Sequence, residues 1–235
     1  MRRLLIFVAV IVGCTGAAQA ATYDISTDFS TASNPNGVWT YGYSTTLGGI
    51  LIPYDQPSTN GDGIQFWQSS IVQVSGTPVD FNNQTNGAII TCGGCDALPA
   101  HTAAFHPGPN GEFSVYRFIA PSAGIYMLDA TFGGLDHGGT DVHILDNGAE
   151  IYSANIATQG DSQSHSETRT LLLGETIDFA VGRGIDGTFY YDSTSINGSL
   201  TTNAIPEPEI YALLMAGLGL TGFVARRRKK ALAAA

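Results

Sequence analysis

Short runs of alternating apolar and polar residues recur through the middle of the chain and predict β-strands. In residues 113–118, Phe113 and Val115 fall on one face of an extended segment, and Tyr116 and Phe118 fall on the other. This period of two is typical of a strand that is buried on at least one side. Turn residues follow at 121–124, and the apolar run 125–132 is expected to return as the second strand of a hairpin.

The clearest hairpin is predicted around Asn147-Gly148. The flanking segments 141–145 and 149–153 have strand composition, and Asn-Gly supplies the positive φ angles that a tight hairpin turn needs. A second strand pair is expected at 171–173 and 176–181, and a further strand at 188–191. Antiparallel strands at such short spacing predict an all-β fold, an antiparallel β-sandwich with a jelly-roll-like topology, over residues 21–204.

The N-terminal apolar run predicts a secretory signal peptide over residues 1–20. Arg2 and Arg3 precede the apolar stretch Leu4–Val12, and Ala18-Gln19-Ala20 has the small-x-small pattern that signal peptidase cleaves. An alternative is that Cys14, at the end of Ile11-Val12-Gly13-Cys14, is a lipidated N-terminus.

A second uncharged run, residues 210–225, predicts a single C-terminal transmembrane helix. Sixteen residues rise about 24 Å as a helix, a short span for a hydrocarbon core of about 30 Å. A basic block follows and places the C-terminus in the cytoplasm by the positive-inside rule; it consists of Arg226, Arg227, Arg228, Lys229 and Lys230.

The tail resembles the PEP-CTERM sorting signal, which exosortases recognise in bacteria that make extracellular polysaccharide. The resemblance rests on the motif Pro206, Glu207 and Pro208, on the apolar run after it, and on Arg226-Arg227-Arg228 at its end. It implies a sorting signal over residues 205–230 with exosortase as a partner. It also implies an intermediate anchored in the inner membrane, followed by release to the cell surface or extracellular matrix. A plain C-terminal membrane anchor is the alternative.

The segment His106–Leu200 is similar to the jelly-roll modules of PEP-CTERM proteins, which have galactose-binding and carbohydrate-binding-module architecture. The similarity lies in residues 106–108, 117–126, 140–145 and 174–182. It implies a binding domain without catalysis, although a fold by itself does not fix a function.

The net negative charge of residues 21–204 limits the kinds of molecule that the domain can bind. Residues 21–204 contain fourteen Asp, four Glu and no Lys, and their basic residues are Arg117, Arg169 and Arg183. Such an acidic domain repels nucleic acid and anionic lipid, so we expect neutral sugars, cations or matrix components as partners.

Candidate site residues are few. Cys92 and Cys95 are expected to form a disulfide in an oxidising compartment. Trp39, Tyr43 and Trp67 are candidates for stacking on sugar rings, with core packing as the alternative. Asp136, Asp141 and Asp192 are candidates for a calcium site, because Ca²⁺ takes oxygen ligands. Two alternatives to calcium are solvated turn aspartates and a zinc site formed by Asp141 with two histidines, His137 and His143.

We find no catalytic motif, so the sequence predicts a non-enzymatic, exported protein that binds polysaccharide or protein and requires no cofactor other than, at most, Ca²⁺. A secreted hydrolase or lyase of polysaccharides, using an Asp/Glu pair, is the first alternative. A calcium-dependent adhesin is the second.

Overall fold

The computed structural model describes residues 20–91, 96–203, 214–223 and 226. Ala20–Asn203 forms one compact unit, and residues 214–223 form a helix whose side chains are exposed. No helix in the described ranges has both the length and the apolar character needed to cross a membrane.

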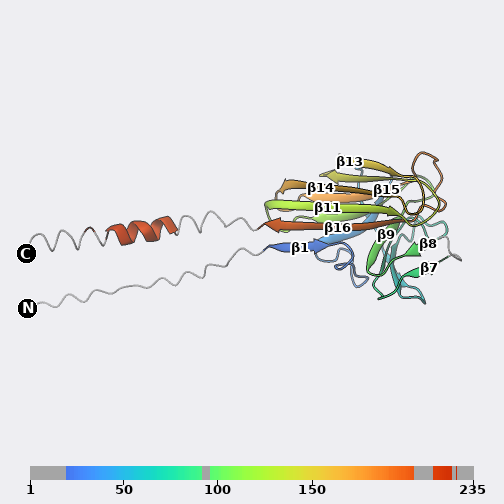
Figure 1. Cartoon of the computed structure of the whole chain (residues 1–235), viewed down its shortest axis with the longest axis horizontal. Coiled ribbons are helices and arrows are strands. Elements are labelled where there is room, and N and C mark those ends of the chain that lie inside the picture. The colour runs from blue at the N-terminus through green and yellow to red at the C-terminus, as the bar shows by residue number, and fades with distance from the viewer. Residues whose placement is uncertain (1–19, 92–95, 204–213, 224–225, 227–235) are drawn as a thin grey trace, which may run out of the picture. The chain divides into compact units, whose positions relative to one another are not determined.

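The compact unit consists of antiparallel sheets packed face to face, with a small two-stranded sheet beside them (Figure 1). The first sheet has eight strands, in the order β14 (Ser162–Leu171), β11 (Gly124–Gly134), β16 (Thr194–Asn203), β9 (Thr102–His106), β6 (Val79–Asn83), β5 (Ile64–Gln68) and β4 (Gln56–Thr59), with β1 (Ala21–Asp24) also paired to β16.

The second sheet has six strands, in the order β13 (Ala149–Ile156), β12 (Thr140–Asp146), β15 (Thr176–Gly182), β10 (Phe113–Ile119), β2 (Trp39–Ser44) and β3 (Ile52–Pro53). Strands β7 (Ile89–Thr91) and β8 (Asp96–Leu98) form the small sheet. The architecture confirms the predicted antiparallel β-sandwich.

The core lies between the two large sheets and follows from the period-two pattern of their strands. Along β11, the side chains of Tyr126, Leu128, Ala130 and Phe132 are buried, and the residues between them are exposed. Aromatic rings from β2, β10 and β15 meet them from the second sheet; the largest fully buried ones include Trp39, Tyr41, Tyr116, Phe118 and Phe179.

Two of the predicted strand pairs are wrong: three of their four strands form but pair differently, and the predicted strand at 171–173 does not form, because β14 ends at Leu171 and a turn follows. β10 pairs with β15 and β2 in the second sheet, whereas β11 pairs with β14 and β16 in the first. The chain therefore crosses from one sheet to the other at 120–123 and does not turn back as a hairpin. β14 and β15 likewise lie in different sheets. From β10 to β16 the chain changes sheet repeatedly, as in a jelly roll.

The hairpin at Asn147-Gly148 is confirmed. β12 and β13 pair antiparallel from Thr140↔Ile156 to Asp146↔Ala149, with a bulge between Ile144 and Leu145. Asn147 and Gly148 both have positive φ, 50° and 81°, as a two-residue turn of this kind requires.

A separate apolar cluster covers the outer face of the first sheet, the face turned away from the second sheet. Its buried members are Ile64, Val79, Phe81, Leu98, Ala104 and Leu135. The predicted strand at 188–191 is wrong, because these residues form an irregular segment and a turn. That segment lies next to the outer-face cluster and forms part of the site described below.

Both ends of the unit leave it at the same place. β1 pairs with the last residues of β16, with Ala21 opposite Thr202. Figure 1 shows the start of β1 and the end of β16 at one end of the sandwich, with β7 and β8 at the other.

Candidate functional site

A pocket of about 450 Å³ opens on the outer face of the first sheet. Its floor follows from strand register, because residues opposite one another on paired strands share a face. Phe66 lies opposite Phe81, and the next row toward the pocket rim is Gln68, Val79 and His106. The volume lies within the range of about 300–1,000 Å³ that small-molecule sites occupy.

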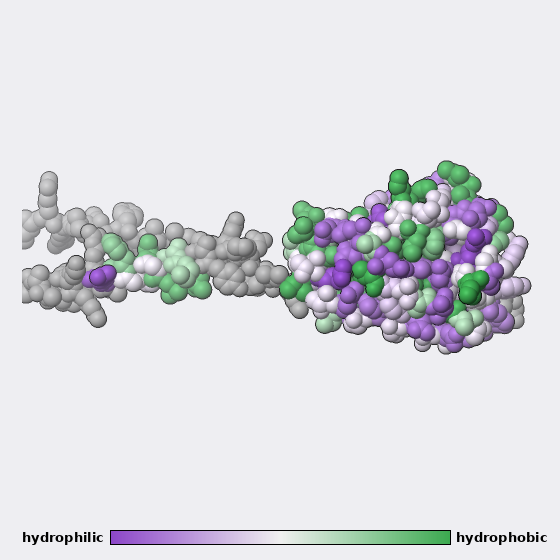
Figure 2. Space-filling view, turned by 90° about the horizontal axis from the view of Figure 1, so that it is seen from above, coloured by the Kyte–Doolittle hydropathy of each residue, from purple (hydrophilic) through white to green (hydrophobic). Residues whose placement is uncertain are grey.

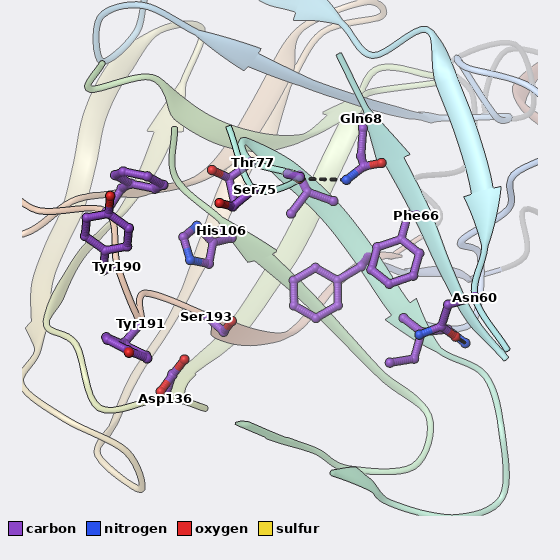
Figure 3. Close-up of a pocket in the computed structure, with 15 residues that line it drawn as sticks. Asn60, Phe66, Gln68, Ser75, Thr77, His106, Asp136, Tyr190, Tyr191 and Ser193 are labelled. Carbon is purple, nitrogen blue, oxygen red and sulfur yellow. Dashed lines mark hydrogen bonds between the residues drawn. The ribbon is translucent and has the colours of Figure 1, made fainter. Parts of the chain in front are cut away.

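The loop at 75–77 forms one wall, and Asp136 with the segment 189–193 forms the other, as Figure 3 shows. Ser75 and Thr77 stand on one side of His106, Ser193 and Asp136 stand on the other, and Tyr190 and Phe66 lie on opposite flanks. Tyr190 and Tyr191 are 61% and 60% exposed, so their rings remain available to a ligand.

The aromatic rings of the pocket form two groups. Phe66 and Phe81 stack on the floor, with ring centroids 5.8 Å apart. Phe189 lies 4.4 Å from Tyr190 and meets the His106 ring edge-on at 6.4 Å. The pocket therefore offers apolar ring surfaces on two sides, and polar atoms lie between them.

His106 is a neutral side chain fixed by its backbone. Its Nδ1 donates a hydrogen bond to the Pro107 carbonyl, 2.9 Å away, so Nε2 is left as an acceptor. Burial lowers the pKa of His106, and this effect outweighs the Pro107 carbonyl and the Asp136 charge, which both raise it. At neutral pH the imidazole can therefore accept a hydrogen bond from a hydroxyl.

Hydrogen bonds hold both walls in place. Gln68 Nε2 donates to the Gly76 carbonyl at 2.7 Å, which ties the 75–77 loop to the floor. On the other side, Leu135 N donates to Ser193 O at 3.0 Å and Gly138 N donates to Tyr191 O at 2.8 Å. The segment that carries the two tyrosines is thus fixed to the 135–138 loop.

Asp192 follows directly after these tyrosines and is buried. Its side chain is fully enclosed, and neither carboxylate oxygen has a hydrogen-bond partner among the residues that the structure describes. Burial first, and then the nearby charges of Asp186, Asp136 and Asp141, raise its pKa to about 8. An enclosed, unpaired carboxyl group is costly in a folded protein and requires an explanation.

The sugar-stacking prediction for Trp39, Tyr43 and Trp67 is wrong. All three are at most 5% exposed and lie in the core between the sheets. Trp39 Nε1 donates to Asp28 Oδ2 at 3.1 Å, and Trp67 Nε1 donates to Ser30 O at 2.7 Å. Tyr43 stacks on Tyr54. Their ring faces therefore contact protein and are not available to a ligand.

The structure does not bring Asp136, Asp141 and Asp192 together as three ligands of one ion. Within the described ranges, no three His, Cys, Asp or Glu side chains are gathered as a metal site. Asp141 bonds instead to His143 Nε2 at 2.8 Å and accepts from Gly184 N at 2.7 Å. The zinc alternative fails for the same reason, since His137 is paired with Asp136 and His143 with Asp141 and Glu150.

Several predicted residues lie outside the described ranges. These are the signal peptide up to residue 19, Cys92 and Cys95, the motif Pro206, Glu207 and Pro208, and the basic residues Arg227, Arg228, Lys229 and Lys230. Arg226 is described, is helical and is exposed.

Asp136, a candidate calcium ligand in the sequence analysis, lines the pocket, but sequence reasoning missed the other pocket residues. Tyr190 and Tyr191 form a pair of aromatics a few residues after Gly184 and Gly187, which both adopt positive φ. Glycines followed by paired aromatics are a signal for an exposed aromatic loop, but the run was assigned to a strand. Phe66 and His106 gave no signal, because only the strand pairing places them on one face.

Comparison with known proteins gives one family match and several weak structural likenesses. Residues 204–229 match the family model of the PEP-CTERM protein-sorting motif. No curated protein matches the chain.

Among solved structures, one match is a family 51 carbohydrate-binding module from Clostridium perfringens GH95 in complex with methyl-galactose. The matched region covers 77% of this chain and 99% of the module, with 11% identity and a TM-score of 0.37. A structure described as that of a family 4 carbohydrate-binding module covers 68% of this chain and 100% of its own, with 15% identity and a TM-score of 0.33. The tandem family 51 modules of a family 98 glycoside hydrolase from Streptococcus pneumoniae SP3-BS71 cover 70% of this chain and 48% of their own, with 12% identity and a TM-score of 0.39. TM-scores this low do not establish a common fold, so the fold assignment rests on the strand order given above. The chain carries a PEP-CTERM protein-sorting motif, which implies an exported protein that an exosortase processes.

Proposed function

We propose that this protein is an exported, non-catalytic polysaccharide-binding protein of the cell surface or extracellular matrix, with its binding site in the outer-face pocket of the first sheet. The observation that carries the proposal is the combination, in one pocket, of exposed tyrosine rings with buried, oriented polar atoms.

This combination fits the chemistry of a sugar. A pyranose presents an apolar C–H face, which packs on an aromatic ring, and a rim of hydroxyl groups that need hydrogen-bond partners. Tyr190 and Tyr191 supply ring faces at the pocket rim. His106 and the other polar residues that line the pocket supply acceptors and donors for hydroxyl groups; these residues are Asn60, Gln68, Ser75, Thr77, Asp136 and Ser193.

Charge favours a neutral polysaccharide over an acidic one. Arg117 pairs with Asp178 through Nε at 2.7 Å and Nη2 at 2.8 Å, and Arg169 pairs with Asp146. Arg183 donates to the Pro109 carbonyl at 3.2 Å. The described part of the domain contains no lysine and thus offers no basic patch for the carboxylates or sulfates of an acidic polymer.

The acidic residues of the pocket favour binding over hydrolysis. Glycosidases place two carboxyl groups on either side of the bond that they cleave. Among the described residues that line the pocket, Asp136 is the one carboxylic acid. The hydrolase or lyase alternative predicts soluble products when the protein is incubated with the polymer.

The sorting motif supports the location. We propose that signal peptidase removes residues 1–20 and that the 205–230 segment holds the protein at the inner membrane. An exosortase then processes the tail and releases the domain of residues 21–204 to the surface or matrix.

The binding proposal is tested by titrating the purified domain with neutral oligosaccharides, and with the polysaccharide of the producing cell, in a calorimeter. Replacing Tyr190 or Tyr191 by alanine is expected to weaken binding about tenfold, equivalent to about 1.4 kcal/mol, because each change removes a ring face. The melting temperature should stay constant, since both rings are exposed.

Ile185→Ala is the matched control. Ile185 lies in the same loop and is fully exposed, but it does not line the pocket. Full binding by both tyrosine variants, or no binding of any neutral glycan by the wild type, would count against the proposal. Release of reducing sugars would support the hydrolase alternative.

A further inference from the structure

A second cavity, of about 490 Å³, lies on the same outer face of the first sheet. Its floor is formed by β11 and β16, whose pairing places Thr131 opposite Asn197 and Gly133 opposite Ser195. The loop 159–162 forms one of its walls. We call this cavity the second pocket, and the tyrosine-lined cavity described above the first pocket.

The two pockets are neighbours, because three segments of the chain contribute residues to both. The pairs, with the residue of the first pocket named first, are His106 and Thr102 in β9, Asp136 and Leu135 after β11, and Ser193 and Ser195 beside the start of β16. Asp136 and Leu135 are consecutive, so one chain segment separates the pockets. Ser193 and Ser195 are two residues apart, which is about 7 Å in an extended chain. Figure 3 shows Asp136 and Ser193 on the side of His106 where the second pocket begins.

Hydrogen bonds fix the segment between the pockets. Leu135 N donates to Ser193 O at 3.0 Å, and Leu135 O accepts from Gln159 Nε2 at 2.8 Å. The backbone of Gly134 exchanges two further bonds of 2.9 Å with the backbone of 160–161. The two pockets therefore keep a constant spacing, and a ligand that enters both does not have to order the segment between them.

The second pocket has the polar groups that sugar hydroxyls need, but its described lining includes no aromatic ring. Its polar side chains, besides Thr102, are Thr131, Gln159, Asp161, Ser162, Ser195 and Asn197. The described lining includes one carboxylic acid and no basic side chain, as in the first pocket. Both pockets therefore suit an uncharged ligand rich in hydroxyl groups. Because the second pocket offers no ring on which a sugar can stack, it suits a sugar unit that is already attached to one held elsewhere.

We propose that the two pockets bind a single neutral polysaccharide chain, with one sugar on the tyrosine rings of the first pocket and a later unit hydrogen-bonded in the second. This inference rests on the proposed function and adds that the ligand is recognised as a polymer, not as a single terminal sugar. A second contact on the same chain does not lose translational freedom again, so affinity should rise with the length of the fragment until both pockets are filled.

The test uses fragments of the polysaccharide of the producing cell, prepared by partial acid hydrolysis and separated by length. In calorimetric titration of the purified domain, fragments that reach both pockets should bind about tenfold more tightly than the shortest fragment that binds, which corresponds to a few additional hydrogen bonds. Each such fragment should occupy one domain. An affinity that does not change with length would overturn the second subsite.

Thr131→Trp and Met127→Trp form the matched pair of variants. Both residues are exposed on the outer face of β11; Thr131 lines the second pocket, and Met127 is not among the described residues that line either pocket. Thr131→Trp fills the second pocket and should lower the affinity for long fragments about tenfold, to that of the shortest fragment. Met127→Trp should leave the affinity for long fragments unchanged. Equal effects of the two variants would overturn the second subsite.

Asn197→Ala is a milder second variant, which decides if Thr131→Trp does not fold. Asn197 is exposed and lines the second pocket, so the change removes an amide without opening the core. It should weaken binding of the long fragments about threefold, as expected for one hydrogen bond. Binding of long fragments at wild-type affinity would contradict the contact.

The two proposals fail separately. Absence of binding at every fragment length overturns the proposed function, and the second subsite with it. If Tyr190→Ala and Tyr191→Ala weaken binding but long and short fragments bind equally well, the proposed function stands and the second subsite is overturned.

Discussion

At the scale of single residues, Asp80 is a carboxylic acid enclosed between the two sheets. Its Oδ1 accepts from Ser114 Oγ at 2.8 Å, its Oδ2 accepts from Gly42 N at 3.2 Å, and its side chain is fully buried. Burial raises the pKa of Asp80 well above its usual value, and this outweighs the two hydrogen bonds. The folded protein therefore keeps a proton that the unfolded chain releases above about pH 4.

We predict that Asp80 makes the domain less stable as pH rises from about 5 toward its folded pKa. The free energy of unfolding should fall by about 1.4 kcal/mol per pH unit from this group. Asp80→Asn should flatten this slope in urea unfolding series at pH 5 to 9. Equal slopes for wild type and variant would show that Asp80 ionises freely in the fold.

His143 has the opposite dependence on pH. Burial lowers its pKa, but the hydrogen bonds to Asp141 at 2.8 Å and Glu150 at 2.6 Å, together with their charges, outweigh burial and raise it. For Asp141, burial raises the pKa, but the hydrogen bonds from His143 and the Gly184 amide and the His143 charge together lower it by more. The net shift of the Asp141 pKa is therefore downward.

The pair formed by His143 and Asp141 should therefore stabilise the domain most between about pH 4 and 6.5. The contribution of His143 is complete below its ordinary pKa of 6.5 and is lost as pH rises through the raised value. The contribution of Asp141 is lost as pH falls through its lowered value. NMR titration should place the His143 pKa above 6.5, and Glu150→Gln should lower it toward that value. A His143 pKa at or below 6.5 in the wild type would contradict the prediction.

The aromatic residues show what a sequence tells about single positions. Trp39, Tyr43 and Trp67 were candidates for a surface, yet all three are in the core, while Tyr190 and Tyr191 were assigned to a strand and are exposed. In a sandwich each strand has an inner and an outer face, and both can be apolar. Alternation identifies the two faces of a strand, but it does not say which one meets the other sheet.

At the scale of elements, five strands between residues 113 and 181 were predictable and their pairing was only partly so, whereas β1–β9 and β16 were not predicted. Runs of apolar residues located β10, β11, β12 and β15; β11 alternates between buried and exposed positions, whereas β12 and β15 are buried at nearly every position. Asn147-Gly148 also fixed a pairing, since those residues need positive φ at two successive positions. The connection at 120–123 did not fix a pairing, because proline and serine suit a crossing between sheets as well as a hairpin.

The β12–β13 turn gives an element-scale prediction. Gly148 has a φ of 81°, and a Cβ atom there would meet the Gly48 carbonyl at 3.3 Å. Gly148→Ala should destabilise the domain by about 1–2 kcal/mol, because an L-residue is strained in the left-handed region.

Gly61→Ala is its control in denaturant unfolding. Gly61 has no positive φ, and a Cβ atom there meets nothing within 4 Å. The midpoint of the control should stay within error of the wild type. Equal stability of Gly148→Ala and wild type would show that the turn relaxes to another conformation.

At the scale of the whole molecule, the surface agrees with an exported protein that works in water. Figure 2 shows hydrophilic residues over most of the visible face of the sandwich, with hydrophobic residues in small, separate groups. The composition of residues 21–204, acidic and free of lysine, was readable from the sequence. The pocket was not, because its residues come from β5, β6, β9 and four separate loops that only the tertiary fold brings together.

The sorting proposal predicts the effect of removing the tail. Deleting residues 206–230 should leave the folding of the domain unchanged, since Ala20–Asn203 is a compact unit by itself. The truncated protein should lose membrane retention and appear in the medium, as fractionation and immunoblotting would show. An unchanged location would contradict a role of the PEP-CTERM motif in sorting.

The course of β16 has a mechanical consequence. It starts one residue after Ser193 of the pocket and ends at Asn203, directly before the matched tail, about 33 Å away for ten extended residues. Before the tail is processed, a polymer held in the pocket and a membrane holding the tail would therefore pull on the two ends of one strand. Because β16 is paired with β11 along ten residues, such tension acts along the strand and loads those hydrogen bonds in shear, so that they resist together and do not open one after another.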